Sequence, residues 1–217
     1  MKYKCLVLDH DDTVVRSTPD IHYPSFVESM KELRPDIEPY TLEEFVSYCF
    51  EPGFHPLCRE ILKYNDEEMK RQQEVWRKYT GSVVPDVYDG FVELIKSFKE
   101  QGGYICVVSH SEKERILRDY DEKIGIVPDL VFGWEAEEWQ RKPNPYPLEE
   151  IMKRLKLKSD DLLMVDDLKP GLDMARICNV DFCCAGWSHM IPSIVEFMSD
   201  KSDYYFSKID QLSNLVL

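Results

Sequence analysis

A short apolar run near the start of the chain ends in a group of acids. The run extends from Cys5 to Leu8 and is followed by Asp9, Asp11 and Asp12. A short apolar run bounded by polar residues is typical of a strand that is buried in a parallel sheet. The acids then lie at the carboxyl end of this strand, which is where open α/β sheets bind their ligands.

The next stretch, residues 16–85, has the spacing of helices and no strand pattern. Apolar residues recur at helical intervals from Tyr23 to Leu33. Two pairs of residues three positions apart are typical of helix starts, in which each side chain can bond the backbone of the other residue. We interpret the stretch as a small helical insertion. The two pairs are Thr41 with Glu44 and Asn65 with Glu68.

From residue 86 onward, short apolar runs alternate with amphipathic helical patterns. Such alternation predicts an α/β fold with a doubly wound, Rossmann-like parallel sheet and right-handed crossovers. Ser111 with Glu114 is expected to cap one of the helices. The strands expected after the first are residues 104–108, 130–132, 162–165 and 182–185, with one more strand and a helix at the end of the chain.

Composition and charge narrow the range of functions. The 217 residues have a formal net charge of -14, which disfavours binding to nucleic acid or to an anionic membrane. The seven cysteines include no CxxC pair, so we expect reduced, buried thiols and neither a disulfide framework nor a zinc site. No apolar run approaches the length of a membrane span, and no signal peptide precedes the first strand. We therefore expect a cytoplasmic protein.

Polar residues follow three of the expected strands, and a lysine follows a fourth. The carboxyl ends of parallel strands share one edge of the sheet, so these residues should meet although they are far apart in sequence. Several carboxylates at one place repel each other unless a cation compensates them, and oxygen ligands favour Mg²⁺. The residues concerned are Asp9 and Asp11, Ser109, Lys142, and Asp166 with Asp167.

Four segments in this order resemble the four sequence motifs of the haloacid dehalogenase superfamily. They read DHDDT, VVSHS, RKPNP and VDDLKPG. The resemblance implies a catalytic core of residues 1–15 and 86–217, with residues 16–85 as the helical cap of the phosphatase and phosphomutase branch. It also implies a Mg²⁺-dependent phosphatase that acts on a small soluble phosphate monoester.

The resemblance assigns a role to each candidate residue. Asp9 would attack the phosphorus and form an aspartyl-phosphate, and Asp11 would protonate the leaving oxygen and later deprotonate water. Ser109 and Lys142 would bind the phosphoryl oxygens. The metal ligands would be Asp9, the main-chain carbonyl of Asp11, and Asp167 supported by Asp166.

Two features keep other functions open. Asp12 stands where the family usually has glycine, which adds charge beside the phosphate site and raises the alternative of a catalytically silent, metal-binding regulatory protein. A sugar phosphomutase would use the same Asp9 chemistry and is the other alternative. Asp11 argues against dehalogenation, because a halide leaves without protonation.

The substrate contacts of the helical insertion are not fixed by any motif. Histidine and arginine side chains there could contact an anionic leaving group, and aromatic side chains could stack on it. The sequence gives no indication of the oligomeric state. The candidates are His22, His55, Arg59, Arg71 and Arg77, with Phe54 and Trp76 as stacking residues.

Overall fold

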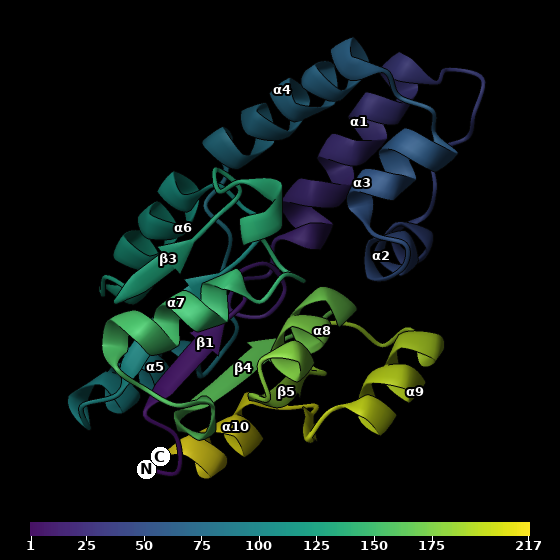
Figure 1. The fold of residues 1–217 in the computed structure, drawn as a ribbon. Coiled ribbons are helices and arrows are strands. Elements are labelled where there is room, and N and C mark those ends of the chain that lie inside the picture. The colour runs from purple at the N-terminus through teal and green to yellow at the C-terminus, as the bar shows by residue number, and fades with distance from the viewer. The chain divides into compact units, whose positions relative to one another are not determined.

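The computed structural model describes residues 1–217, the whole chain. Contacts within the chain divide it into two compact units. The core unit comprises Met1–Arg16 and Asp86–Leu217, and the helical unit comprises Ser17–Pro85. Figure 1 labels the elements of both units. No helix combines the length and the apolar character that crossing a lipid bilayer requires.

The core unit is built on a six-stranded sheet in which all pairings are parallel. Its strand order is β3-β2-β1-β4-β5-β6, so the chain starts in the middle and winds outward to both sides. The predicted doubly wound α/β fold is confirmed. The strands are β1 (Cys5–Leu8), β2 (Tyr104–Val108), β3 (Leu130–Phe132), β4 (Leu162–Asp166), β5 (Asp181–Ala185) and β6 (Tyr204–Phe206).

The register of the central strands brings their carboxyl ends to one level. Leu8 of β1 pairs with Val107 of β2 on one side and with Val165 of β4 on the other. The residues that follow these three positions therefore reach the same edge of the sheet. This edge holds the candidate site.

Helices connect the strands of the core unit. The long ones begin after proline, glycine or extended residues and end within about three turns, as is usual between parallel strands. They are α5 (Phe91–Glu100), α6 (Lys113–Asp119), α7 (Tyr146–Leu155), α8 (Lys169–Ile177), α9 (Pro192–Lys201) and α10 (Ile209–Val216). Shorter turns of helix are η3 (Tyr120–Ile124), η4 (Glu138–Gln140) and η5 (Ser159–Asp161).

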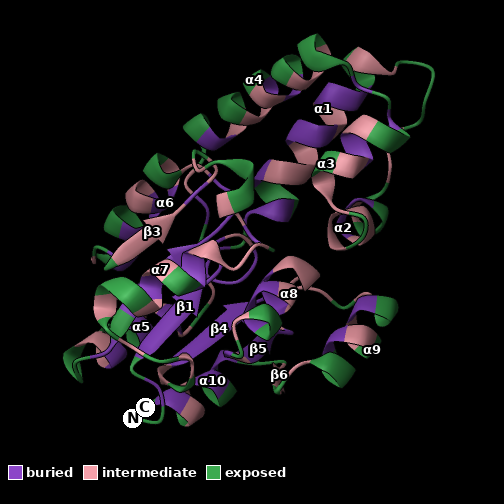
Figure 2. Cartoon of the chain, viewed as in Figure 1, coloured by how far each residue is buried: buried purple, intermediate pink, exposed green.

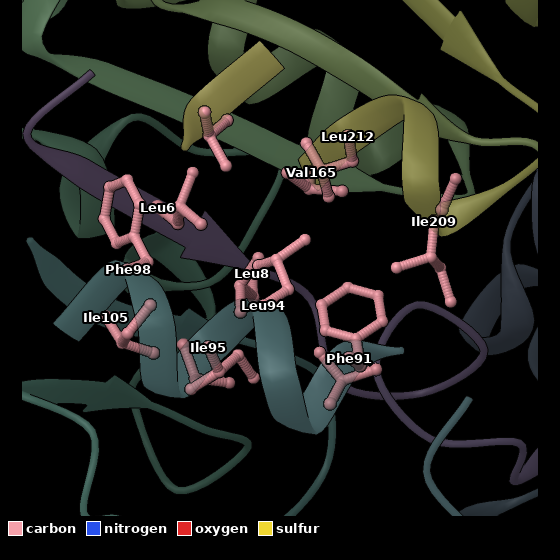
Figure 3. Close-up of a cluster of buried hydrophobic side chains, with 14 of the residues drawn as sticks. Leu6, Leu8, Phe91, Leu94, Ile95, Phe98, Ile105, Val165, Ile209 and Leu212 are labelled. Carbon is pink, nitrogen blue, oxygen red and sulfur yellow. The ribbon is translucent and has the colours of Figure 1, made fainter. Parts of the chain in front are cut away.

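Helices α5 and α10 cover one face of the sheet. Phe91 and Leu94 of α5 and Leu212 of α10 pack with Leu6 and Leu8 of β1 in one buried cluster (Figure 3). Burying an aliphatic or aromatic side chain of this size contributes about 1.5–3 kcal/mol to folding. This apolar layer fixes β1, and with it the acids at the end of β1.

Strand β1 is buried on both faces. Because side chains alternate along a strand, Cys5 and Val7 point away from the face that Leu6 and Leu8 cover. All four are inaccessible to solvent, and the central strands are accordingly drawn as buried in Figure 2. This explains the uninterrupted apolar run in the sequence. All seven cysteines of the chain are free thiols.

The helical unit contains helices only. Both capping boxes expected from the sequence are confirmed: Thr41 caps α2 and Asn65 caps α4 by the reciprocal backbone bonds of this motif. Helices α1 and α4 pack together, and the ring of Phe26 in α1 packs against that of Phe45 in α2 in a tilted arrangement, with centroids 4.6 Å apart. The helices are η1 (Thr18–His22), α1 (Tyr23–Leu33), α2 (Leu42–Phe50), α3 (Phe54–Pro56), η2 (Leu57–Ile61) and α4 (Asp66–Ser82).

Candidate active site

The acid that follows β1 is held at the sheet edge by its backbone. The N–H of Asp9 donates to the carbonyl of Val165 at 2.9 Å, so the pairing between β1 and β4 continues by one residue. Asp166 and Asp167 follow Val165 directly and are buried, as is Asp9. The parallel register therefore brings acids from two distant segments together, as the sequence predicted.

Lys142 lies between two of these acids. Its Nζ is 2.7 Å from Oδ1 of Asp9 and 2.6 Å from Oδ2 of Asp166. Only 6% of the lysine side chain is exposed, so the ammonium reaches the acids from the loop before α7 without contact with bulk water. An isolated buried charge is very costly, and the ion pairs offset much of that cost.

Burial and pairing act in opposite directions on these groups. Burial raises the pKa of Asp166 to about 6, although the nearby Lys142 ammonium opposes the rise. Burial also raises the pKa of Asp9 well above its usual range, and Lys142 again opposes the rise. For Lys142, burial alone would lower the pKa, but the charges of Asp166 and Asp9 outweigh it and raise the pKa.

Gly171 in the first turn of α8 makes room for Asp166. A Cβ atom at position 171 would lie 2.2 Å from Oδ2 of Asp166, far inside van der Waals contact. The other oxygen, Oδ1, accepts from the N–H of Leu168 at 2.9 Å. Asp166 is thus fixed by backbone on one side and by Lys142 on the other, and the glycine of the fourth motif has a steric explanation.

Asp11 faces two hydroxyl groups. Its Oδ2 accepts from Ser111 Oγ at 2.5 Å and from Ser109 Oγ at 3.3 Å. The expectation that Ser111 caps a helix is wrong, because α6 begins at Lys113 with Glu112 as its N-cap residue, which makes no side-chain cap bond. The Asp11 carboxylate fixes Ser111 instead, a contact between segments 100 residues apart that local spacing cannot indicate.

The chain turns tightly between the first strand and the helical unit. The carbonyl of His10 accepts from the N–H groups of both Val14 and Val15, at 3.0 and 3.1 Å. Asp12 within this turn has a φ of 55°, in the left-handed region that glycine adopts without strain. Aspartate is one of the few other residues that tolerate this conformation, so the turn survives its presence.

Three carboxylates could hold a divalent cation. One oxygen each of Asp9, Asp166 and Asp167 lie within 4.8 Å of one another, and all three residues are buried. Carboxylate oxygens alone suit a hard cation such as Mg²⁺, so the residues present fit the metal that the sequence suggested. The Asp11 carboxylate is directed to the two serines and is outside this group.

Two histidines near the motifs were not assigned from the sequence. His10 Nε2 is 3.0 Å from Asp119 Oδ2, and both side chains are almost fully buried. His110 Nε2 bonds the carbonyl of Lys142 at 2.9 Å, although the histidine itself is exposed to solvent. Neither contact has a short-range sequence signal, since each joins residues more than 30 positions apart.

The helical candidates for substrate contact are mostly engaged within their own unit. Arg59 pairs with Asp66, and Arg71 forms a two-point ion pair with Glu32. The indole N–H of Trp76 donates to His22 Nδ1 at 2.9 Å, with the two rings stacked. These contacts explain the side chains as structural elements of the helical unit.

The arrangement in the core unit suits Asp9 to act as a nucleophile and Asp11 to carry protons. Lys142 binds one oxygen of Asp9 and leaves the other oxygen available to attack an electrophile. Asp11, two residues later, is partly exposed and held by hydroxyl groups. A carboxylate kept in place by a lysine can attack an electrophile and form a covalent intermediate. A second carboxyl nearby can donate and accept the protons that this reaction needs.

Comparisons with known proteins give a family match and a shared fold. The family model of the haloacid dehalogenase-like hydrolases matches residues 6–185. The chain is 24% identical over 172 residues to the pyrophosphatase PpaX of Halalkalibacterium halodurans, a match that covers 77% of this chain and 76% of that protein.

Solved structures share the fold over nearly the full length. A predicted phosphoglycolate phosphatase of Haemophilus somnus superposes with a TM-score of 0.80 at 16% identity, covering 100% of this chain and 99% of the other. A mutant of CbbY from Rhodobacter sphaeroides, in complex with xylulose-(1,5)bisphosphate, superposes with a TM-score of 0.73 at 14% identity and covers 97% and 96% of the two chains.

Proposed function

Because the chain belongs to the haloacid dehalogenase-like hydrolases, we propose that it is a Mg²⁺-dependent phosphatase that hydrolyses a small phosphate monoester through a phosphorylated Asp9. The hydrolase class that the sequence predicted agrees with this membership. The related proteins are named for pyrophosphate and phosphoglycolate, and one was solved with a sugar bisphosphate. All three are small phosphate compounds, and the two that are phosphate monoesters support the proposed substrate class.

The position of Lys142 is the observation on which the proposal rests. A buried ammonium within 2.7 Å of Asp9 and of Asp166 reduces the repulsion that an incoming phosphate dianion would meet. It also keeps one oxygen of Asp9 occupied, so attack on phosphorus comes from the other oxygen. Lys142 thereby orients the nucleophile and stabilises the charge on the transferred group.

In the first step, an oxygen of Asp9 forms a bond to phosphorus while the bond from phosphorus to the ester oxygen breaks. The leaving oxygen takes a proton from Asp11, so the alcohol departs neutral. Ser109 and Ser111, which donate to Asp11 before the reaction, hold its carboxyl in place. Ser109 can rotate to donate to a phosphoryl oxygen, because a hydroxyl has one freely rotating hydrogen.

In the second step, water replaces Asp9 on the phosphorus. Asp11, now ionised, accepts a proton from the attacking water, and inorganic phosphate and the free carboxylate of Asp9 are released. Both steps use the same two acids in reversed proton roles. The enzyme returns to its initial protonation state at the end of the cycle.

Mg²⁺ would be held by Asp9 and Asp167, with Asp166 in support, and when bound it would neutralise negative charge where phosphate and carboxylate meet. The helical unit follows the first motif in sequence, and we assign it the role of the cap that covers small substrates in this family. A cap must open to admit water between the two steps.

The first experiment measures phosphate release from an aryl phosphate with and without Mg²⁺, for the wild type and for Asp9→Asn. We expect Mg²⁺-dependent release that the substitution abolishes, since an amide is not a nucleophile toward phosphorus. Inorganic pyrophosphate, phosphoglycolate and a sugar bisphosphate are then compared as substrates. Binding of Mg²⁺ without release from any of them would refute the phosphatase and favour a silent metal-binding protein or, if phosphoryl groups move between sugars, a mutase.

A further inference from the structure

A histidine outside the four motifs contacts the candidate metal ligands. His189 lies in the loop after β5, and its Nε2 is 2.7 Å from Oδ2 of Asp167. Its side chain is 12% exposed and Asp167 is 3% exposed, so the bond is largely shielded from water. The loop is closed on itself by Ser188, whose hydroxyl donates to the carbonyl of Ala185 at 2.6 Å.

Asp167 needs such a restraint because of its neighbours. Its carboxylate is within 4.8 Å of those of Asp9 and Asp166, and like charges at this distance repel each other. Lys142 forms its ion pairs with Asp9 and Asp166. Asp167 is therefore the member of the group that depends on other donors for its orientation.

The donors on the two oxygens of Asp167 differ in strength. Thr13 Oγ1 donates to Oδ1 at 3.4 Å, which is long for a hydroxyl donor. The imidazole bond to Oδ2 is 0.7 Å shorter, at 2.7 Å. His189 thus supplies the stronger of the two contacts that aim this carboxylate.

Asp12 makes the restraint more important. Its side chain is almost completely buried, and Oδ2 lies 3.9 Å from the same imidazole nitrogen. One oxygen of Asp12 also falls within 4.8 Å of the ligand atoms of Asp167 and His189. A fourth carboxylate thus stands beside Asp167, one of the three candidate metal ligands, and the imidazole lies next to both Asp12 and Asp167.

We propose that His189 is a positioning residue, whose Nε2–H bond to Asp167 aims that carboxylate at the metal position against the repulsion of Asp12. The inference rests on the metal site of the proposed function. Removing a side chain that hydrogen-bonds a metal ligand without contacting the metal typically lowers metal affinity about 10- to 100-fold, because the ligand loses its orientation. His189 acts on the metal through Asp167 and does not touch the substrate.

Metal binding can be measured without any turnover. The metal-free protein is titrated with Mn²⁺, and the free ion is counted by its electron paramagnetic resonance signal; Mg²⁺ is then added to show competition for the same site. We expect His189→Leu to weaken Mn²⁺ binding about tenfold or more at an unchanged stoichiometry of one. His189→Gln, whose amide can donate to Asp167, should recover part of the affinity.

Two further variants complete the design. Met190→Ala changes the neighbouring residue of the same loop, which is 79% exposed, and should leave Mn²⁺ affinity unchanged. In the background of Asp12→Gly, the loss caused by His189→Leu should shrink to less than about threefold, since residues that share one network are not additive. An undiminished loss in that background would overturn the role given to Asp12.

If His189→Leu lowered the unfolding midpoint but left Mn²⁺ affinity unchanged, His189 would have only a structural role, and the inference would be overturned. A stoichiometry of two that falls to one in His189→Leu would also overturn it, because the histidine would then be a ligand. A wild type that binds Mn²⁺ but releases no phosphate would refute the phosphatase alone. A wild type that binds neither ion would overturn the metal site and the inference together.

Discussion

The two units of the chain hold their charges in opposite ways. In the core unit, Asp9 and Asp166 are buried around Lys142. In the helical unit, Arg34 pairs with Glu68 near the surface, with 20% and 24% of the side chains exposed. Water stabilises the surface charges of the helical unit in both the folded and the unfolded chain. The buried charges of the core unit lose that stabilisation on folding.

The pKa values of the acids differ accordingly. Burial raises the pKa of Asp166 to about 6, while the hydrogen bonds from Arg34 and from the N–H of Asn65 lower the pKa of Glu68 to about 2. Charges that cost stability are found where chemistry is proposed. Charges that favour folding are found where helices are joined.

Removing Lys142 should have the largest effect. Lys142→Met leaves two buried carboxylates without their cation, and we expect a loss of about 4 kcal/mol in the free energy of unfolding at pH 8, with phosphatase activity reduced about 100-fold or more. At pH 5 the stability loss should be smaller, because protonation of the acids relieves the repulsion. Urea unfolding in chelator at both pH values measures it.

The matched control for this change is Lys123→Met. Lys123 forms a surface ion pair with Asp86, which is 89% exposed, and its loss should not change stability measurably. Equal effects of the two substitutions would contradict the distinction between buried and surface charge.

The pH dependence of stability should have opposite signs in the two units. An acid with a raised pKa keeps its proton in the folded chain, so the metal-free core should lose stability, on the order of 3 kcal/mol, as pH rises from 3.8 to about 6. Glu68 contributes stability above pH 4.5 that is lost as pH falls toward about 2. Hydrogen exchange of β4 and of α4, corrected for intrinsic rates, follows each unit separately.

Mg²⁺ should reduce the loss of stability that the core unit shows as pH rises, because the metal binds the ionised carboxylates. The exchange of α4 should not respond to the metal. A core whose protection increases over the same pH range without metal would contradict the cost assigned to the buried acids.

The sequence predicted the parts of the site that follow from strand topology. Asp9, Asp166 and Asp167 come directly after apolar runs, and parallel strands must place such residues at one edge. Their proximity therefore followed from the pattern alone. Lys142 could be included only through the resemblance of its motif, because a lysine in a proline-rich loop has no periodicity that aims it at Asp9.

The contacts that were missed all depend on loop conformation. Ser111 has the spacing of a helix cap, but the helix starts two residues later and the hydroxyl bonds Asp11. His189 is 22 residues from Asp167 in sequence and reaches it only because the loop after β5 turns back. Local propensity describes strands and helices, whereas such loops are fixed by the tertiary packing around them.

The smallest effect is expected for the ion pair of Arg34 with Glu68 in the helical unit. Substitutions of Arg34 distinguish the contribution of its hydrogen bonds from that of its charge. Arg34 lies at the end of α1 and donates to the carbonyls of Leu62 and Lys63 as well as to Glu68. We expect Arg34→Met to cost about 1 kcal/mol, since the backbone carbonyls that the guanidinium bonds lose their partner. Arg34→Lys should lose most of the same stability, because an ammonium cannot reproduce the planar fork.

Arg71→Met is the control for this prediction. Arg71 joins α4 to Glu32 of α1 by side-chain contacts alone, with both partners more than 40% exposed, so its loss should leave the exchange of α1 and α4 unchanged. If Arg71→Met destabilised these helices as much as Arg34→Met, surface charge itself would hold the helical unit together. The contrast with the core would then be one of degree, and Arg34→Lys would retain the stability that its charge supplies.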